Sequence, residues 1–148
     1  MPTKEARKDW MSVLARAPSI SLNRAVEALG SLPDATWLRP PETGAIMVRG
    51  RQGGTGAPFN LGEMTVTRCA LRLADGQVGH AYVPGRDHAH ARQAAICDAL
   101  MQGPRAGEVE EKVLGPIRDA LAADRQSQAA KAEATKVDFF TMVRGESK

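Results

Sequence analysis

The dipeptide Asp75–Gly76 constrains the fold more than any other short stretch of this chain. It lies between two runs rich in valine, threonine, leucine and tyrosine, within residues 63–85. An Asp-Gly pair with such flanks is the strongest short-range signal for a β-hairpin, because glycine readily adopts the positive φ of a tight turn. The sequence therefore predicts two antiparallel strands joined at this dipeptide.

The turn also predicts which side chains share a face of the hairpin. If Asp75 and Gly76 are the two loop residues, Ala74 pairs with Gln77 and the register counts outward from there. The pairs on the apolar, core-facing side are then Leu73 with Val78, Leu71 with His80, and Cys69 with Tyr82. His80 would be either a core histidine or an acid–base group, since histidine titrates near neutral pH. With Arg86 it forms a candidate polar site.

The rest of the pattern predicts a single α+β domain over residues 1–148. We expect a small antiparallel sheet with a central hairpin, packed by N-terminal, middle and C-terminal helices. The expected parts are a helical hairpin at 4–31, sheet and glycine-rich loop at 45–84, helices at 87–132 and an apolar segment at 136–145. Asp87 is the expected N-cap of the middle helix, and the RPPETG string at 39–44 is expected to be a loop.

The apolar segment near the C-terminus is unusual in a helical context. It contains Phe139, Phe140, Met142 and Val143, and two of the three phenylalanines of the chain lie here. Valine, threonine and phenylalanine favour a strand. The segment is therefore expected either to complete the sheet as a further strand or to be a terminal arm that contacts a partner.

The glycine-rich stretch Val48–Arg68 holds five glycines within thirteen residues, flanked by arginines. A Walker A loop needs a lysine after its last glycine, and no lysine occurs between Lys8 and Lys112. A dinucleotide fingerprint needs a third glycine where Phe59 stands and a helix after it, whereas a strand-like run follows. Both phosphate-binding motifs are therefore excluded.

Two interpretations of this stretch stay open. Successive backbone N–H groups of a glycine loop can form an anion-binding nest, to which nearby arginines add charged donors. Alternatively, the glycines only permit a bend between strands. The candidate anion contacts are Arg49, Arg51, Gly53, Gly54, Thr55 and Gly56.

Composition and charge argue against several other classes. Aromatic residues make up 4% of the chain and the net charge is +3, which favours neither a stacking surface for single strands nor a polyanionic partner. We expect no nucleic-acid partner.

Cys69 and Cys97 form no CxxC pair, and His88 and His90 point apart on a helix, so no metal site is expected. No long apolar run is present, so we expect a cytoplasmic protein without a membrane segment.

The longer motifs resemble one protein family. Three long strings occur in order, RGRQGGTGAPFNLGEMTVTRCALRL, GHAYVPGRD and TKVDFFTMVRGE, and the shorter RKDWMSVLARA and LRPPETGAIMVRGR also fit. On these residues, roughly from Arg7 to Glu146, the chain resembles the G subunit of the bacterial carbon–phosphorus lyase system, the PhnG family. The linker at 103–111 matches nothing distinctive.

The resemblance implies a subunit of a multi-protein complex for phosphonate utilisation. Together with the H, I and L proteins, this subunit would help to transfer the ribose triphosphate of ATP to a phosphonate such as methylphosphonate, with release of adenine. The I subunit is implied as the direct partner, with H and J as further partners. The iron–sulfur cluster and S-adenosylmethionine belong to the J subunit, so no cofactor is expected on this chain alone.

The resemblance assigns no catalytic residue to this chain, so two roles remain open. In the first, an accessory subunit helps to hold an anionic substrate. In the second, a purely structural subunit makes only protein contacts.

Overall fold

The computed structural model describes residues 2–51 and 56–146. The chain divides into two compact units, Met1–Ile117 and Arg118–Lys148. The single-domain organisation expected from the sequence stays a prediction. The sheet, the N-terminal helices and the middle helix all belong to the first unit.

The sheet has three antiparallel strands, β1 (Ala35–Arg51), β2 (Pro58–Leu73) and β3 (Val78–Pro84), in the order β1-β2-β3. β1 and β2 form a long hairpin, and β3 pairs with β2 only from Val66 to Arg72. The described parts of the glycine-rich stretch, residues 48–51 and 56–68, therefore belong to the two strands of this hairpin and include its far end. We call the part of this hairpin that extends past β3, residues 45–51 and 58–65, the ribbon.

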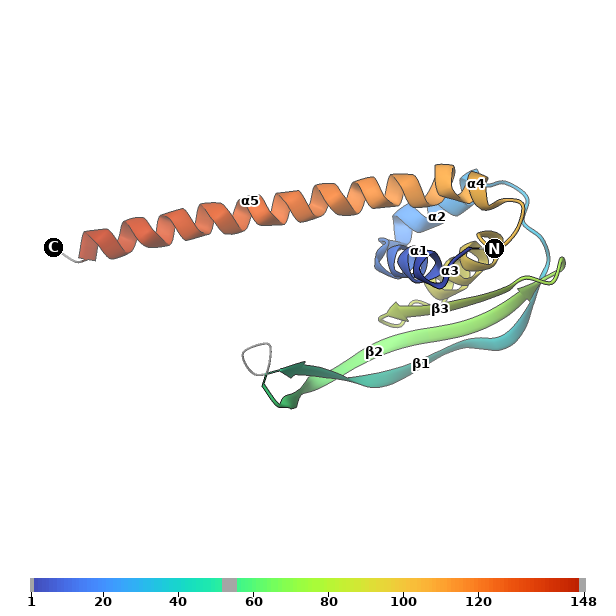
Figure 1. Cartoon of the computed structure of the whole chain (residues 1–148), viewed down its shortest axis with the longest axis horizontal. Coiled ribbons are helices and arrows are strands. Elements are labelled where there is room, and N and C mark those ends of the chain that lie inside the picture. The colour runs from blue at the N-terminus through green and yellow to red at the C-terminus, as the bar shows by residue number, and fades with distance from the viewer. Residues whose placement is uncertain (1, 52–55, 147–148) are drawn as a thin grey trace. The chain divides into compact units, whose positions relative to one another are not determined.

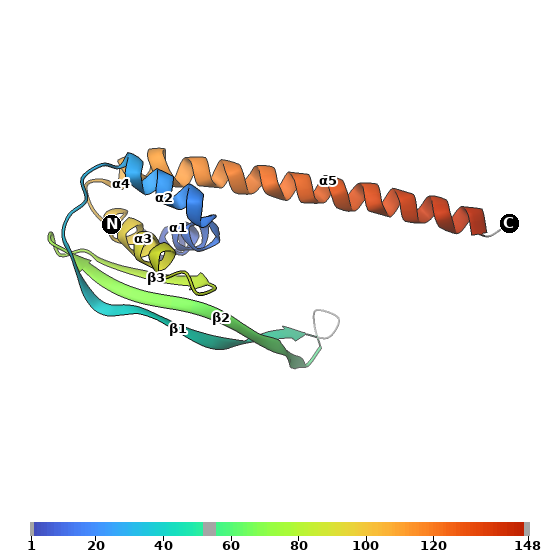
Figure 2. The ribbon, with the colours of Figure 1, turned by 180° about the vertical axis from the view of Figure 1, so that it is seen from behind.

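Helices cover one face of the sheet, as Figures 1 and 2 show from opposite sides. They are α1 (Lys4–Arg16), α2 (Ser19–Ala28) and α3 (His88–Leu100). α3 packs directly on β2 and β3, and α1 packs on both α3 and β3. The expected helical hairpin at the N-terminus and the expected Asp87 cap of the middle helix are both confirmed. We call the helix-covered side of the sheet the inner face and the opposite side the outer face.

The close packing of α3 on β3 depends on small residues. Gly79 of β3 lies against the backbone of α3, where an added Cβ would overlap the carbonyl oxygen of Ala95. Ala91, Ala95 and Ala99 of α3 have no exposed surface. The inner face and the alanine side of α3 therefore form the centre of the core.

The predicted hairpin exists, but its predicted register is wrong by one residue on β3. Leu73 N donates to Gln77 O at 2.8 Å, so the loop has three residues, with Gly76 at a φ of 99°. Leu71 consequently pairs with Gly79, and His80 pairs with Ala70. Because side chains alternate between faces, this slip moves every β3 side chain to the opposite face. His80 and Tyr82 are exposed on the outer face, whereas Ala81 and Val83 are buried.

The loop predicted at 39–44 is also wrong, because β1 continues through it. The pairing with β2 shifts between Trp37 and Arg39 and again between Arg39 and Glu42. These irregularities accommodate Pro40 and Pro41 in an edge strand, where a missing backbone N–H costs no ladder hydrogen bond.

The C-terminal helical region has three consecutive parts, α4 (Ala106–Val109), the π-helical turn η2 (Glu110–Leu114) and α5 (Gly115–Glu146). Pro116 lies in the first turn of α5, where its missing N–H is tolerated. The alternative of a strand at 136–145 is not realised, because these residues are helical. The alanine-rich run before them is strongly helix-forming, and no proline interrupts the propagation.

Among the helices of the described residues, none is long and apolar enough to cross a membrane.

Candidate functional site

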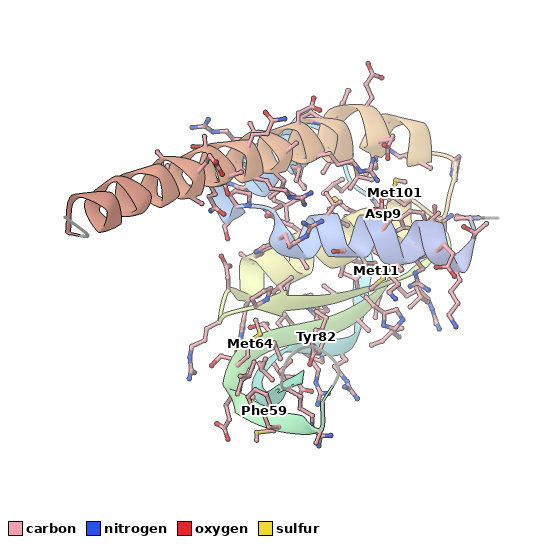
Figure 3. The ribbon with its side chains drawn as sticks, turned by 60° about the vertical axis from the view of Figure 1, so that its left-hand side comes forward. Asp9, Met11, Phe59, Met64, Tyr82 and Met101 are labelled. Carbon is pink, nitrogen blue, oxygen red and sulfur yellow. The ribbon has the colours of Figure 1, made fainter. Side chains whose placement is uncertain are left out.

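A groove runs along the outer edge of β3, where α1 meets the sheet. It consists of two adjoining pockets of about 550 and 410 Å³, which share Met11 of α1 and His80 of β3. The larger pocket is lined by the three strands and Met11: Met11, Leu38, Arg39, Arg68, Cys69, Ala70, His80, Ala81 and Tyr82. The smaller pocket is lined almost entirely by α1: Lys4, Arg7, Lys8, Met11 and His80. Figure 3 shows Met11 on α1 and Tyr82 on the sheet beside it.

The α1 side of the groove is a stripe of basic residues along one side of the helix. Lys4, Arg7, Lys8 and Met11 follow a spacing of three or four residues, which places their side chains on one helix face. Trp10, Val13 and Leu14 form the buried face of the same helix. Burial of this apolar face against α3 and β3 therefore directs the basic stripe toward the groove.

A buried carboxylate fixes the position of α1. Asp98 of α3 has no exposed side-chain surface, and its two oxygens accept four hydrogen bonds. Arg7 donates from Nε and Nη2 at 3.2 and 2.9 Å, and Trp10 donates from Nε1 at 2.8 Å. The backbone N–H of His80 donates to Asp98 at 2.8 Å. The hydrogen bond to Asp98 raises the pKa of Arg7, so this arginine stays charged.

The sheet side of the groove carries two arginines that share one carboxylate. Glu42 Oε1 lies 2.9 Å from Arg68 Nε and 3.7 Å from Arg39 Nη1. Tyr82, which pairs with Arg68 across the two strands, is 47% exposed. The groove therefore has an aromatic ring and arginine planes at one end and lysines at the other.

The electrostatic balance of the groove is positive. Five cationic side chains line it: Lys4, Arg7, Lys8, Arg39 and Arg68. Among the described residues, these cations form ion pairs with two carboxylates, Asp98 and Glu42. No carboxylate side chain is among the residues lining the two pockets. Such a groove can bind an anion, and His80 at its centre can donate or accept a hydrogen bond.

A second polar cluster contains a serine, a histidine and an aspartate but has no catalytic arrangement. His90 Nε2 lies 2.8 Å from the Leu14 carbonyl oxygen, so Nε2 carries the proton. Ser19 Oγ lies 2.6 Å from Asp87 Oδ2 and 3.5 Å from His90 Nδ1, so the hydroxyl donates to the carboxylate. In a catalytic triad the histidine accepts the nucleophile's proton. This cluster instead caps α3 and fastens α2 to it.

Three of the residues predicted as anion contacts, Arg49, Arg51 and Gly56, lie at the far end of the β1–β2 hairpin, and Arg49 and Gly56 line neither pocket of the groove. Arg49 is exposed and pairs with Asn60, and Gly56 is half-buried in a bend. The backbone of Arg51 ends β1. Gly53, Gly54 and Thr55 lie outside the described residues.

The polar site predicted from His80 and Arg86 stays a prediction. His80 lies in the groove, whereas Arg86 follows β3 and lines neither of its pockets. The residues predicted as a partner interface, Phe139, Phe140, Met142 and Val143, lie within the bounds of α5, and the structure describes only their backbone.

The sequence prediction missed the residues of the groove other than His80. The signal for α1 is in the string KEARKDWM, where Lys4, Lys8 and Met11 recur at helical spacing on the side opposite the apolar face. The sequence prediction placed Tyr82 in the core because the predicted register of the β2–β3 hairpin differs from the observed one by one residue. Arg39 was assigned to a loop.

In the part of the chain that the structure describes, no three histidine, cysteine or carboxylate side chains are grouped to hold an ion. The side chains that line the groove can stabilise an anion by their charge and can stack against a flat ring.

Comparison with known proteins identifies the family. The family model described as phosphonate metabolism protein PhnG matches residues 5–145. A relative from Rhizobium meliloti (strain 1021), named alpha-D-ribose 1-methylphosphonate 5-triphosphate synthase subunit PhnG, is 46% identical over 140 residues. The match covers 95% of this chain and 90% of that protein. The chain therefore belongs to the PhnG family of phosphonate metabolism proteins.

Proposed function

We propose that this chain is a subunit of the multi-protein enzyme that makes alpha-D-ribose 1-methylphosphonate 5-triphosphate. The observation that carries the proposal is the 46% identity to a protein of that name across 95% of the chain. In this reaction a phosphonate displaces adenine from the anomeric carbon of ATP, and the product retains the triphosphate. The chain acts in the cytoplasm with the H, I and L proteins.

The role we propose for the chain is accessory. The groove offers cations and an aromatic ring, and the serine–histidine–aspartate cluster of Ser19, His90 and Asp87 is arranged as a helix cap. The iron–sulfur and S-adenosylmethionine chemistry belongs to the J subunit. This chain contributes binding and positioning to a reaction whose bond-breaking groups are shared with its partners.

The ribbon supports a role in an assembly, because its outer face is apolar and exposed. Ile46 pairs with Met64, and Gly50 pairs with Phe59, on the same face of this hairpin. Leu61 lies beside Phe59 there, since a Cβ added to Gly50 would be 3.1 Å from Leu61 Cδ1 and 3.3 Å from Phe59 Cζ. Leu61 is 63% exposed and Phe59 is 46% exposed. Figure 3 shows Phe59 and Met64 on this hairpin.

We assign the apolar face of the ribbon to the I subunit, as the direct partner. Contiguous exposed apolar residues on a two-stranded hairpin are typical of a surface that another protein covers. Phe139, Phe140, Met142 and Val143 are a second proposed contact with a partner, and H and J are further partners in the complex.

The function is tested by reconstitution of the synthase from purified subunits with ATP and methylphosphonate. Adenine release should require this chain, and the product should carry both the triphosphate and the phosphonate by mass and ³¹P spectra. Equal adenine release without the chain would contradict the proposed function.

The assembly surface is tested by a matched pair of substitutions. Leu61→Glu lies on the apolar face, whereas Met47, 50% exposed, lies on the opposite face of the same hairpin. Leu61→Glu should weaken co-purification with the I subunit, by about 2 kcal/mol or more if Leu61 is at the centre of the contact. Met47→Glu should have a smaller effect. Equal effects of the two substitutions would contradict this assignment.

A purely structural subunit is the second candidate, favoured by the same apolar face. Under this alternative, Arg49→Ala and Arg51→Ala at the glycine-rich loop would leave adenine release unchanged in an intact complex. Loss of adenine release with intact assembly would instead support substrate contact at the loop.

A further inference from the structure

The lysine end of the groove carries positive charge for which the described residues provide no ion-pair partner. Lys4 and Lys8 are exposed, four residues apart on α1, and like charges at this spacing repel each other. In the described residues, neither lysine forms an ion pair, while Arg7 between them pairs with Asp98. Glu5 and Asp9 of the same helix line neither pocket. An anion bound between the two lysines would relieve this repulsion.

The other end of the groove suits a flat, uncharged ring. Tyr82, the only tyrosine of the chain, is exposed on the outer face beside Arg68. Leu38 and Ala70 complete an apolar floor there. Nucleobases stack on exposed aromatic rings and on guanidinium planes, and this contact depends little on the identity of the base.

The dimensions of the groove fit a ligand that has both features. The two pockets, of about 550 and 410 Å³, meet at Met11 and His80. Small-molecule sites commonly have volumes of about 300 to 1,000 Å³. A nucleotide has a flat base at one end and a chain of phosphates at the other, which matches the order of aromatic and basic residues along the groove.

We propose that the groove binds a nucleoside triphosphate, with its phosphates between Lys4 and Lys8 and its base against Tyr82. The side-chain carboxylate of Asp98 accepts hydrogen bonds from the Arg7 guanidinium and from the backbone N–H of His80, and it thereby holds the two walls of the groove at a set position. This inference rests on the proposed function for its choice of ATP among the nucleoside triphosphates. The proposed nucleotide contact is therefore at the edge where α1 meets β3, whereas the sequence predicted an anion contact at the glycine-rich end of the β1–β2 hairpin.

Binding measurements on the full-length chain test the site, with ATP, inorganic tripolyphosphate and adenosine as probes. ATP should bind most tightly, tripolyphosphate more weakly, and both should lose affinity as salt is raised. Lys8→Ala should weaken ATP and tripolyphosphate by about tenfold each, because it removes a charge-assisted hydrogen bond. Arg24→Ala, an exposed arginine of α2 that lines neither pocket, is the matched control and should change neither affinity.

Two substitutions of Tyr82 separate a nucleotide from a simple polyphosphate. Tyr82→Ala should weaken ATP by about tenfold and leave tripolyphosphate unchanged, because only the base contacts the ring. Tyr82→Phe keeps the ring and should retain ATP affinity. If Tyr82→Ala has no effect and ATP binds no better than tripolyphosphate, the nucleotide assignment is wrong.

Other outcomes would also overturn the inference. Loss of binding on Arg49→Ala but not on Lys8→Ala would place the anion at the hairpin end. If the chain is folded, as judged by its helix content in circular dichroism, and does not bind ATP, the proposed nucleotide site is wrong.

The reconstituted synthase distinguishes failure of the site from failure of the proposed function. If adenine release requires the chain but has the same KM for ATP with Lys4→Ala and Lys8→Ala combined, the groove inference fails and the function stands. If adenine release does not require the chain, the proposed function fails whatever the binding measurements show.

Discussion

Arg7 and Asp98, separated by 91 positions in the sequence, form a two-bond ion pair at the point where α1, α3 and β3 meet. Each oxygen of Asp98 accepts one bond from Arg7 and one from another donor, Trp10 Nε1 or the backbone N–H of His80. The His80 N–H belongs to the unpaired edge of β3, so the carboxylate also satisfies a donor that the sheet leaves free. This arrangement positions the basic stripe of α1 against the edge that forms the groove.

Asp98→Ala should therefore destabilise the protein strongly. It leaves three donor groups without their acceptor, and removal of one partner of a buried ion pair costs about 3 to 5 kcal/mol. Urea unfolding monitored by tryptophan fluorescence measures the change in the free energy of unfolding. Asp119→Ala, at an exposed position in α5, is the control and should be nearly neutral. A loss below about 1 kcal/mol for Asp98→Ala would contradict the role given to this carboxylate.

Gly79→Ala should disrupt the packing of α3 on β3. The added Cβ would overlap the carbonyl oxygen of Ala95 and lie 2.9 Å from Ala99 N, and both contacts involve backbone that cannot move alone. Overpacking of a core costs about 1 to 3 kcal/mol, and a backbone clash lies at the upper end. Thermal unfolding measures this loss. Gly44→Ala on β1 meets no atom within 4 Å and should leave the melting temperature close to that of the wild type.

We predict that Asp87, the N-cap of α3, contributes to the free energy of unfolding and that this contribution is lost in acid. Its hydrogen bonds with Ser19 and with the backbone N–H of His90 lower the pKa of Asp87 from its ordinary value of 3.8. A carboxyl group with a lower pKa in the folded state stabilises the protein above pH 3.8, and this contribution disappears as the pH falls through the folded pKa. Asp87→Ala should cost about 1 kcal/mol near neutral pH.

The measurement for this prediction is the free energy of unfolding of wild type and Asp87→Ala from pH 6 down to pH 2. The difference between the two proteins should shrink below about pH 4, in the range where the carboxylate takes up its proton. A difference that stays constant over this range would exclude a role for the charge of Asp87.

The two cysteines should be unreactive in the folded protein. Burial raises the pKa of Cys69 to about 11, and burial together with the charge of Asp98 raises the pKa of Cys97 to about 12. Because the thiolate is the nucleophile, a thiol with a raised pKa reacts slowly at pH 8. Iodoacetamide should label neither residue in the native state and both in urea, as read by mass spectrometry. Rapid native labelling would contradict the burial of these thiols.

The β2–β3 hairpin shows where prediction from sequence succeeds and where it fails. Asp75–Gly76 indicated correctly that a hairpin forms there, because the turn preference is local. The loop length was not determined locally, since both a two-residue and a three-residue loop can contain Asp-Gly. The three-residue loop places Gly79 inside, against α3, and His80 outside. Only glycine at that inner position allows the helix to approach, and this is a tertiary constraint.

Two other segments differ from their sequence-based prediction because tertiary context outweighs local preference. Pro40 and Pro41 are typical of a loop, yet they fit in β1 because it is an edge strand whose pairing with β2 is irregular. The Phe139–Val143 segment has strand-forming residues, yet it is helical as the continuation of an alanine-rich helix. In each case the local conformational preference of the residues is weaker than the constraint from the strand or helix to which they belong.

The sequence by itself determined the helices 4–31, the existence of the hairpin, the Asp87 cap and, through long uncommon strings, the family. These features depend on side-chain periodicity, turn chemistry and similarity, which are properties of neighbouring residues. The tertiary structure alone decided the face on which His80 and Tyr82 lie and the meeting of Arg7 with Asp98. The groove exists because α3 pairs its buried carboxylate with residues from two distant elements, and such a contact leaves no periodic signal in the chain.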